Sequence, residues 1–108
     1  MTIKEYSDRA IKTAIYPEER AVIYPTLGLV GEAGEVAEKV KKTIRDYDGD
    51  IDEERRVLMA KELGDVLWYL NALSRDLGFS LEEVAELNLH KLEKRAKENK
   101  IHGEGDER

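Results

Sequence analysis

Residues 63–73 read LGDVLWYLNAL, and a helix formed by this stretch would carry apolar side chains on nearly every side. A helix without a polar face needs cover from several neighbouring elements. The rest of the chain shows apolar residues at helical spacing rather than strand-like alternation. The sequence therefore predicts an all-α protein in which this helix packs among others.

Capping residues and apolar periodicity predict four helices joined by short connections. Their expected bounds are Thr2 towards Ile15, Thr26 to about Arg45, Glu53 to Leu77, and the Ser80 cap to about Asn99. The stretch from Pro17 to Pro25 is expected to connect the first two helices, with room for a helical turn. Short connections favour antiparallel neighbours, so we expect a compact antiparallel bundle of four to five helices.

The length of 108 residues fits a single domain, which we expect over residues 1–100. Residues 101–108 are polar and contain glycine, and we expect them to form a flexible C-terminal tail. Four helices in so short a chain leave the helix around residues 63–73 with too few neighbours. We therefore expect completion by oligomerisation, as a homodimer or, through a dimer of dimers, a homotetramer.

The composition argues against several classes of protein. Charged residues make up 39% of the chain, mean hydropathy is -0.61, and no apolar run approaches the roughly 20 residues that span a bilayer. We therefore expect no membrane association. The net charge of -6 opposes binding to a nucleic acid polymer. Cysteine is absent, which excludes disulfides and a thiolate nucleophile, and a cytoplasmic location is the simplest expectation.

Two pairs of acidic residues share an i, i+3 spacing on predicted helices: Glu32 with Glu35, and Glu62 with Asp65. Residues at this spacing share one helical face, so each pair can converge on a common point. Carboxylates brought together repel one another, and apolar surroundings add a desolvation cost. A hard divalent cation removes both costs, so the four acids are candidate Mg²⁺ ligands, with Mn²⁺ as a substitute. The alternative is that they are ordinary solvated residues.

Four glycines lie within or at the start of the same helices: Gly28, Gly31, Gly34 and Gly64. Each internal glycine costs a helix about 1 kcal/mol relative to alanine, so we expect a packing reason for them. The missing side chains would let two helix axes approach, and carboxylates from both helices would then reach one metal.

Asn88, Lys91 and Arg95 form a polar stripe along one face of the last predicted helix. Its two cations suit triphosphate oxygens, lysine as a point charge and arginine as a fork. The alternative is a solvent-facing basic surface near a helix C-terminus, where cations also favour the macrodipole.

Three segments in this order resemble the MazG-type nucleotide pyrophosphohydrolases of the all-α NTP pyrophosphatase superfamily, which also includes dimeric dUTPases and dCTP pyrophosphatases. They are GLVGEAGEVAEKVKK (28–42), KELGDVLWYL (61–70) and NLHKLEKR (88–95). The resemblance implies a helical enzyme that hydrolyses a nucleoside triphosphate to the monophosphate and pyrophosphate, by attack of water at the α-phosphorus.

The resemblance also implies roles for individual residues. The family's acidic signature is EExxE followed later by ExxD, and Glu32, Glu35, Glu62 and Asp65 match four of its five acids as catalytic metal ligands. Gly31 stands at the position of the first glutamate, so an auxiliary role of that acid is missing here. Substrate-binding positions implied for the phosphates and the base are Asn88, Lys91, Arg95 and Tyr69. For Trp68 core packing is the favoured interpretation, and the sequence leaves the identity of the general base open.

Other features of the sequence allow three alternative interpretations. The aspartates of residues 46–50 suggest a calcium loop, but Ile51 and Val57 occupy positions where an EF-hand needs glycine and glutamate. A di-iron centre would need Glu-x-x-His pairs, and neither His90 nor His102 has a glutamate three residues before it. A non-catalytic helical oligomerisation or regulatory module would explain the apolar surface but not the placement of the acids.

Overall fold

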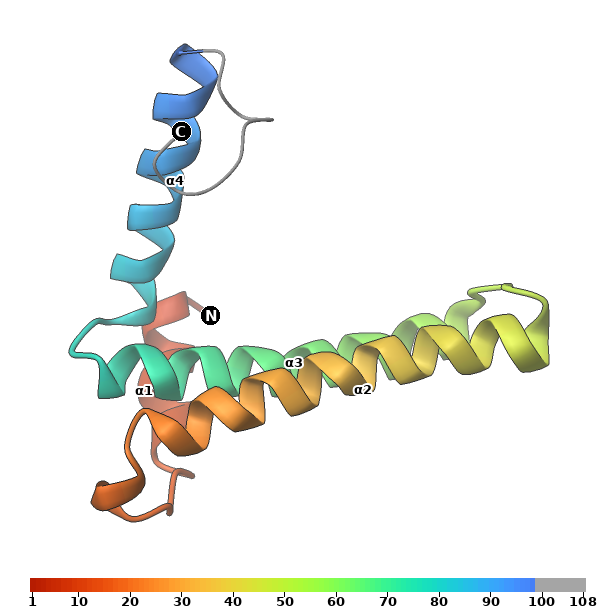
Figure 1. Ribbon diagram of the computed structural model, residues 1–108, viewed down its shortest axis with the longest axis horizontal. Coiled ribbons are helices and arrows are strands. Elements are labelled where there is room, and N and C mark those ends of the chain that lie inside the picture. Colours follow the sequence, from red (N-terminus) through yellow and green to blue (C-terminus); the bar gives the residue numbers. More distant parts are fainter. Residues whose placement is uncertain (99–108) are drawn as a thin grey trace.

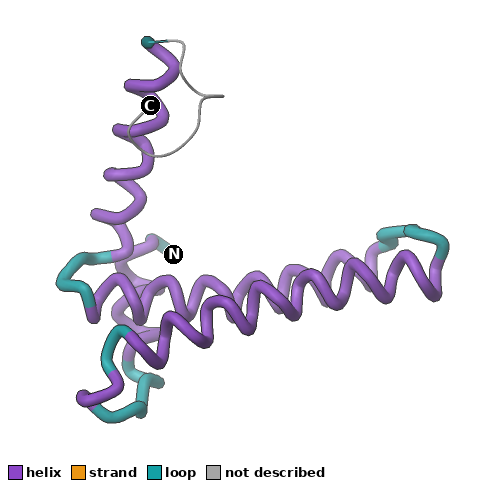
Figure 2. Tube along the Cα trace, in the orientation of Figure 1, coloured by secondary structure: helices purple, strands orange, loops and turns teal. Residues whose placement is uncertain are grey.

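The computed structural model describes residues 1–98, which form α-helices and one short 3₁₀ helix and contain no strand. The elements are α1 (Ile3–Ile11), η1 (Glu18–Arg20), α2 (Ile23–Tyr47), α3 (Glu53–Asp76) and α4 (Leu81–Lys97). Figure 2 shows these helices joined by short loops. The all-α prediction is confirmed, and the predicted tail over 101–108 lies outside the described residues. Within residues 1–98, no helix combines the length and apolarity needed to cross a membrane.

Helices α2 and α3 form a long antiparallel hairpin (Figure 1). The chain reverses at Asp48 and Gly49, whose φ angles of 56° and 79° are left-handed, and the Gly49 N–H donates to the Thr43 carbonyl at 3.1 Å. Asp52 then caps α3 by accepting the Arg55 N–H at 2.9 Å. The predicted connector between these helices is therefore confirmed.

The first two helices differ from their predicted bounds. Helix α1 ends at Ile11 rather than near Ile15, and α2 begins at Ile23 rather than after a cap at Thr26. Pro25 lies inside the first turn of α2, where its missing N–H costs nothing because that turn has no intrahelical acceptor for it. The predicted start at Thr26 had placed Pro25 before the helix. The structure instead includes Pro25 in the first turn of α2.

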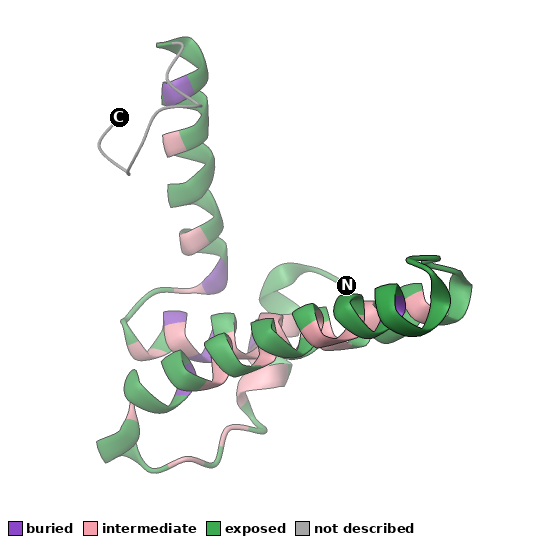
Figure 3. Cartoon of the chain, turned by 45° about the vertical axis from the view of Figure 1, so that its right-hand side comes forward, coloured by how far each residue is buried: buried purple, intermediate pink, exposed green. Residues whose placement is uncertain are grey.

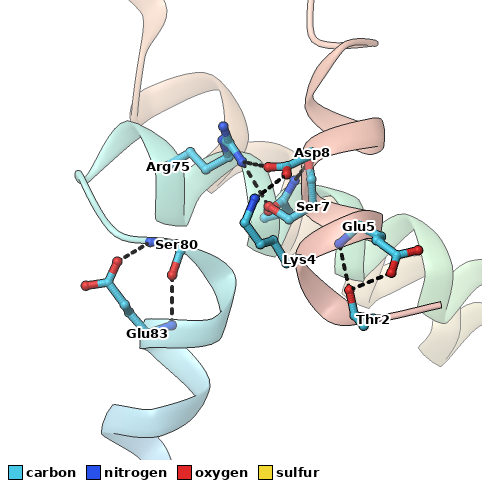
Figure 4. Close-up of polar contacts among 9 residues, drawn as sticks. Thr2, Lys4, Glu5, Ser7, Asp8, Arg75, Ser80 and Glu83 are labelled. Atoms are coloured by element: carbon cyan, nitrogen blue, oxygen red, sulfur yellow. Dashed lines mark hydrogen bonds and ion pairs between the residues drawn. The ribbon is translucent and has the colours of Figure 1, made fainter.

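A buried polar contact joins α1 to α3. The Ser7 hydroxyl donates to the Asn71 side chain, and the Asn71 amide donates to the Ser7 carbonyl at 3.1 Å. Arg75 adds a hydrogen bond to the Ser7 hydroxyl at 3.0 Å (Figure 4). Helix α4 begins beside this junction with the predicted capping box of Ser80 and Glu83, also drawn in Figure 4.

The single chain has little apolar core. Among residues 1–98 the buried hydrophobic residues are Ala72 and Leu81, and Figure 3 shows most of the helical surface exposed. The radius of gyration is 16.7 Å, against about 13 Å for a compact domain of 100 residues. Helix α4 projects away from the α2–α3 hairpin in both Figure 1 and Figure 3. The predicted homo-oligomer stays a prediction, and this open shape is the reason to keep it.

Candidate metal centre

Three carboxylates converge between the two helices of the hairpin. Glu32 comes from α2, and Glu62 and Asp65 come from α3; one ligand oxygen from each lies within 4.8 Å of the others. Glu32 and Glu62 are half-buried and Asp65 is exposed. We call these residues the three-acid cluster. Its donors are all carboxylate oxygens, which is the ligand chemistry that Mg²⁺ selects.

Glu35, the fourth predicted acid, lies outside this cluster. Its side chain is exposed on α2, one helical turn beyond Glu32. It is still close enough for its charge to act on Glu32, as one of the causes that raise the Glu32 pKa. The structure thus separates the acids into three that face one another and one that stands beside them.

Burial and like charge both disfavour the ionised form of Glu32. The pKa of Glu32 is raised above its usual value, first by desolvation and then by the negative charges of Asp65, Glu62 and Glu35. One cation lies nearby: Lys39 Nζ is 4.0 Å from a Glu62 oxygen. Lys39 was not among the predicted site residues, although its position seven residues after Glu32 places it on the same face of α2.

An open pocket of about 260 Å³ joins the acids to two aromatic side chains. Its lining residues are Glu32, Asp65, Trp68 and Tyr69. The Trp68 and Tyr69 rings meet edge to face, with centroids 4.9 Å apart, and Trp68 is anchored by a 2.7 Å hydrogen bond from its indole N–H to Thr13. Charged oxygens on one side and aromatic rings on the other suit a ligand with both phosphate and base.

Only one of the four glycines has a close packing partner within residues 1–98. A Cβ at Gly28 would overlap the Tyr69 ring, so glycine is needed there for this ring to lie against α2. Apart from the chain neighbours and the backbone of the same helix, no described atom lies within 4 Å of a Cβ placed at Gly31, Gly34 or Gly64. The prediction that these three glycines bring helix axes together was therefore wrong for the single chain, since their surroundings are open.

A second pair of aromatic residues, both tyrosines, lies beside Tyr69. Tyr16 and Tyr24 stack with centroids 4.9 Å apart and an interplanar angle of 21°, and Tyr24 lies 6.3 Å from Tyr69. We call Tyr16 and Tyr24 the tyrosine stack. The pKa of Tyr69 is raised by burial, by the Tyr24 hydroxyl beside it, and by the charges of Glu32 and Asp65. The tyrosine stack thus lies next to Tyr69, which lines the pocket together with the acids.

Val22, just before α2, has an unusual backbone. Its φ of 69° and ψ of −53°, with an Ile23 N–H to Ala21 carbonyl bond of 2.8 Å, define a γ-turn with positive φ. This conformation is strained for a β-branched residue and costs on the order of 1–3 kcal/mol. One oxygen of Asp76, the last residue of α3, accepts both the Val22 N–H at 2.9 Å and the Tyr16 hydroxyl at 2.8 Å. No sequence signal identified Asp76, because its partners lie more than fifty residues away.

The polar stripe is not brought to the acids within one chain. Asn88 is exposed, Lys91 half-buried and Arg95 buried, all on α4. Because α4 leads away from the hairpin (Figure 1), the stripe and the three-acid cluster lie on separate arms of the molecule.

Comparison with known proteins identifies the family of this chain. Residues 25–99 match the MazG nucleotide pyrophosphohydrolase domain. The chain belongs to the MazG family. The resemblance drawn from the three sequence segments is thereby confirmed. This MazG protein is also 45% identical over 114 residues to the "Gene 37 protein" of Mycobacterium phage L5, with both chains covered in full. No solved structure matches it.

We predict opposite effects for alanine at two glycines of α2. Gly28→Ala forces the Tyr69 ring to move, and overpacking of this kind costs about 1–3 kcal/mol. Gly31→Ala meets no described atom beyond its chain neighbours and its own helix backbone, and the gain in helix propensity is worth up to about 1 kcal/mol. Thermal unfolding followed by circular dichroism should show a lower Tm for Gly28→Ala and a higher one for Gly31→Ala. Equal shifts in both variants would contradict the contact with Tyr69.

We also predict that Glu32→Gln stabilises the metal-free protein at neutral pH. The raised pKa means that ionised Glu32 disfavours the folded state above that pKa. The penalty is lost as the pH falls through the raised pKa to below the ordinary value of 4.5, so the gain in Tm should shrink over that range. Saturating Mg²⁺ should reverse the sign, because the variant lacks a ligand. Glu86→Gln, at an exposed position on α4, is the control and should show neither effect.

Proposed function

We propose that this MazG-family chain is a Mg²⁺-dependent nucleoside triphosphate pyrophosphohydrolase. The reaction is (d)NTP + H₂O to (d)NMP + pyrophosphate, with water attacking the α-phosphorus. The observation that carries the proposal is the convergence of Glu32, Glu62 and Asp65 within 4.8 Å in a family of nucleotide pyrophosphohydrolases.

The residues present fit a hard divalent cation. Three carboxylates this close repel one another, and the raised Glu32 pKa reflects that repulsion together with burial. A cation held by Glu32, Glu62 and Asp65 would offset it, and Mn²⁺ would substitute for Mg²⁺ because both accept oxygen ligands. When bound, the metal supplies charge stabilisation for phosphate oxygens and a lowered pKa for water.

Glu35 is the acid that we assign to proton transfer. It lies outside the three-acid cluster and is exposed, so its carboxylate is not committed to the other three. It stands one helical turn from Glu32, and its charge acts on that carboxylate. A carboxylate at this position would accept the proton that the attacking water loses.

The aromatic side of the pocket is assigned to the nucleotide base. Trp68 and Tyr69 line the same pocket as Glu32 and Asp65, so a phosphate chain at the acids would place the attached nucleoside against these rings. Stacking on aromatic faces tolerates any base, because every base has a π-face.

The polar stripe is assigned to the leaving pyrophosphate, and we propose that it comes from a second copy of the chain. Helix α4 carries Lys91 and Arg95 away from its own hairpin, whereas the exposed Leu27, Val30 and Leu63 leave the hairpin uncovered. A homodimer that covers these apolar faces would also bring each stripe to the acids of the partner. A homotetramer would form from two such dimers.

The reaction is tested with purified protein, Mg²⁺ and a panel of (d)NTPs, by detecting pyrophosphate separately from orthophosphate. Glu62→Gln and Asp65→Asn should each lower turnover by more than about 100-fold, since even indirect partners of a metal site cost about 10–100-fold. Glu35→Gln should lose turnover but keep metal affinity, measured by Mn²⁺ titration. Glu54→Gln, an exposed acid on the same helix as Glu62, should retain activity.

Three outcomes would count against this proposal. Orthophosphate without pyrophosphate would refute attack at the α-phosphorus. Full turnover in Glu62→Gln or Asp65→Asn would remove them from the site. No turnover on any nucleotide would favour the alternative function, a non-catalytic helical oligomerisation or regulatory module.

Mixing two inactive variants tests the contribution of the second copy. Glu62→Gln lacks working acids and Arg95→Ala lacks a complete stripe, so each homodimer should be inactive. If the stripe acts on the partner, a mixed dimer contains one site with intact acids and an intact stripe, and activity returns when the variants are refolded together. If the stripe acts within its own chain, every site in the mixture is defective and no activity returns.

A further inference from the structure

The two hydrogen bonds of Asp76 link the end of α3 to the segment that precedes α2. The same Oδ2 accepts the Val22 N–H at 2.9 Å and the Tyr16 hydroxyl at 2.8 Å. Both partners precede the hairpin in the sequence. A single carboxylate therefore holds two residues of the segment that leads into α2.

The entry to α2 depends on this contact. Helix α2 has no side-chain cap, and Val22 must hold a positive φ that a β-branched residue rarely adopts. A hydrogen bond to a charged acceptor is among the stronger kinds in proteins, so Asp76 is placed to hold the γ-turn against its strain. Without this hydrogen bond, Val22 can leave its positive φ, and the first turn of α2 can change position.

That first turn positions the tyrosine stack. Tyr24 lies two residues after Val22, and its ring stacks on Tyr16, which Asp76 holds directly. The pKa of Tyr16 is raised to about 12 by burial and by Asp76, which keeps the phenol protonated as a donor. Asp76 thus sets both rings, Tyr16 by a hydrogen bond and Tyr24 through the start of α2.

The tyrosine stack lies beside the pocket at the three-acid cluster. Tyr24 lies 6.3 Å from Tyr69, which lines that pocket together with Glu32 and Asp65, and the Tyr24 side chain is exposed. A nucleotide with its phosphates at the acids and its base along Trp68 and Tyr69 would meet Tyr24 next. The position of this ring then limits the size and orientation of the base.

We propose that Asp76 is a positioning residue for nucleobase selection, which acts by holding Val22 and Tyr16 so that Tyr24 forms the outer wall of the base pocket. This inference rests on the proposed nucleotide hydrolysis. It concerns which base is accepted rather than how the phosphorus is attacked.

The test compares Asp76→Ala with wild type on one purine and one pyrimidine dNTP. We expect KM to rise by about tenfold for the preferred base, less for the other, and kcat to stay within about twofold, because the acids are untouched. The near-UV circular dichroism of the tyrosines should change in parallel. Asp8→Ala removes an aspartate bonded to Lys4 and Arg75, away from the tyrosine stack, and should leave the ratio of the two KM values unchanged.

Two further variants separate positioning from general stability. Val22→Gly in the Asp76→Ala background should restore selectivity and the near-UV signal in part, because glycine adopts positive φ without strain. Tyr16→Phe keeps the ring and the Val22 bond, and should reproduce part of the loss of selectivity even if Asp76→Ala does not fold. An unchanged ratio of KM values and an unchanged near-UV spectrum in Tyr16→Phe and Asp76→Ala would overturn the proposal.

The proposed function can fail separately. If the wild-type protein releases no pyrophosphate, the enzyme assignment is lost, and binding of non-hydrolysable purine and pyrimidine dNTP analogues replaces KM as the readout. Altered discrimination between the analogues in Asp76→Ala would support the positioning role, and equal discrimination in variant and wild type would overturn it.

Discussion

The contact between α2 and α3 has to accommodate the repulsion among three carboxylates. Glu32, Glu62 and Asp65 come together where α2 and α3 pack, and nearby Lys39 is 4.0 Å from Glu62. The three charges repel one another, and the partial burial of Glu32 adds a solvation cost. The pairing of α2 with α3 therefore includes an unfavourable electrostatic contribution that a bound cation would turn into a favourable one.

The aromatic side chains of α3 also constrain how the helices pack. Tyr69 lies against α2 at Gly28, and Trp68 reaches back to Thr13. Trp68 and Tyr69 follow Asp65 by three and four residues on α3, so the same helix carries the acid and both rings. The charged and apolar parts of the pocket are consequently fixed relative to each other by helix geometry rather than by loops.

The features that could be predicted from the sequence are those that depend on residues within one helical turn. The i, i+3 acid pairs and the caps at Asp52 and Ser80 depend on neighbours within one turn, which a sequence displays directly. The start of α2 at Ile23 depends on Asp76, fifty-four residues after Val22, so local signals placed it wrongly at Thr26. The direction of α4 was equally hidden, because it follows from contacts between distant segments.

The sparse apolar core has a thermodynamic consequence. With Ala72 and Leu81 as the buried hydrophobic residues among 1–98, the isolated chain gains little free energy from burial. If a second copy covers Leu27, Val30 and Leu63, folding and association become one equilibrium, and its midpoint moves with protein concentration. The melting temperature would then depend on the protein concentration. In a cell, the folded fraction would rise with the amount synthesised, so that low expression leaves chains exposed to proteolysis while high expression protects them.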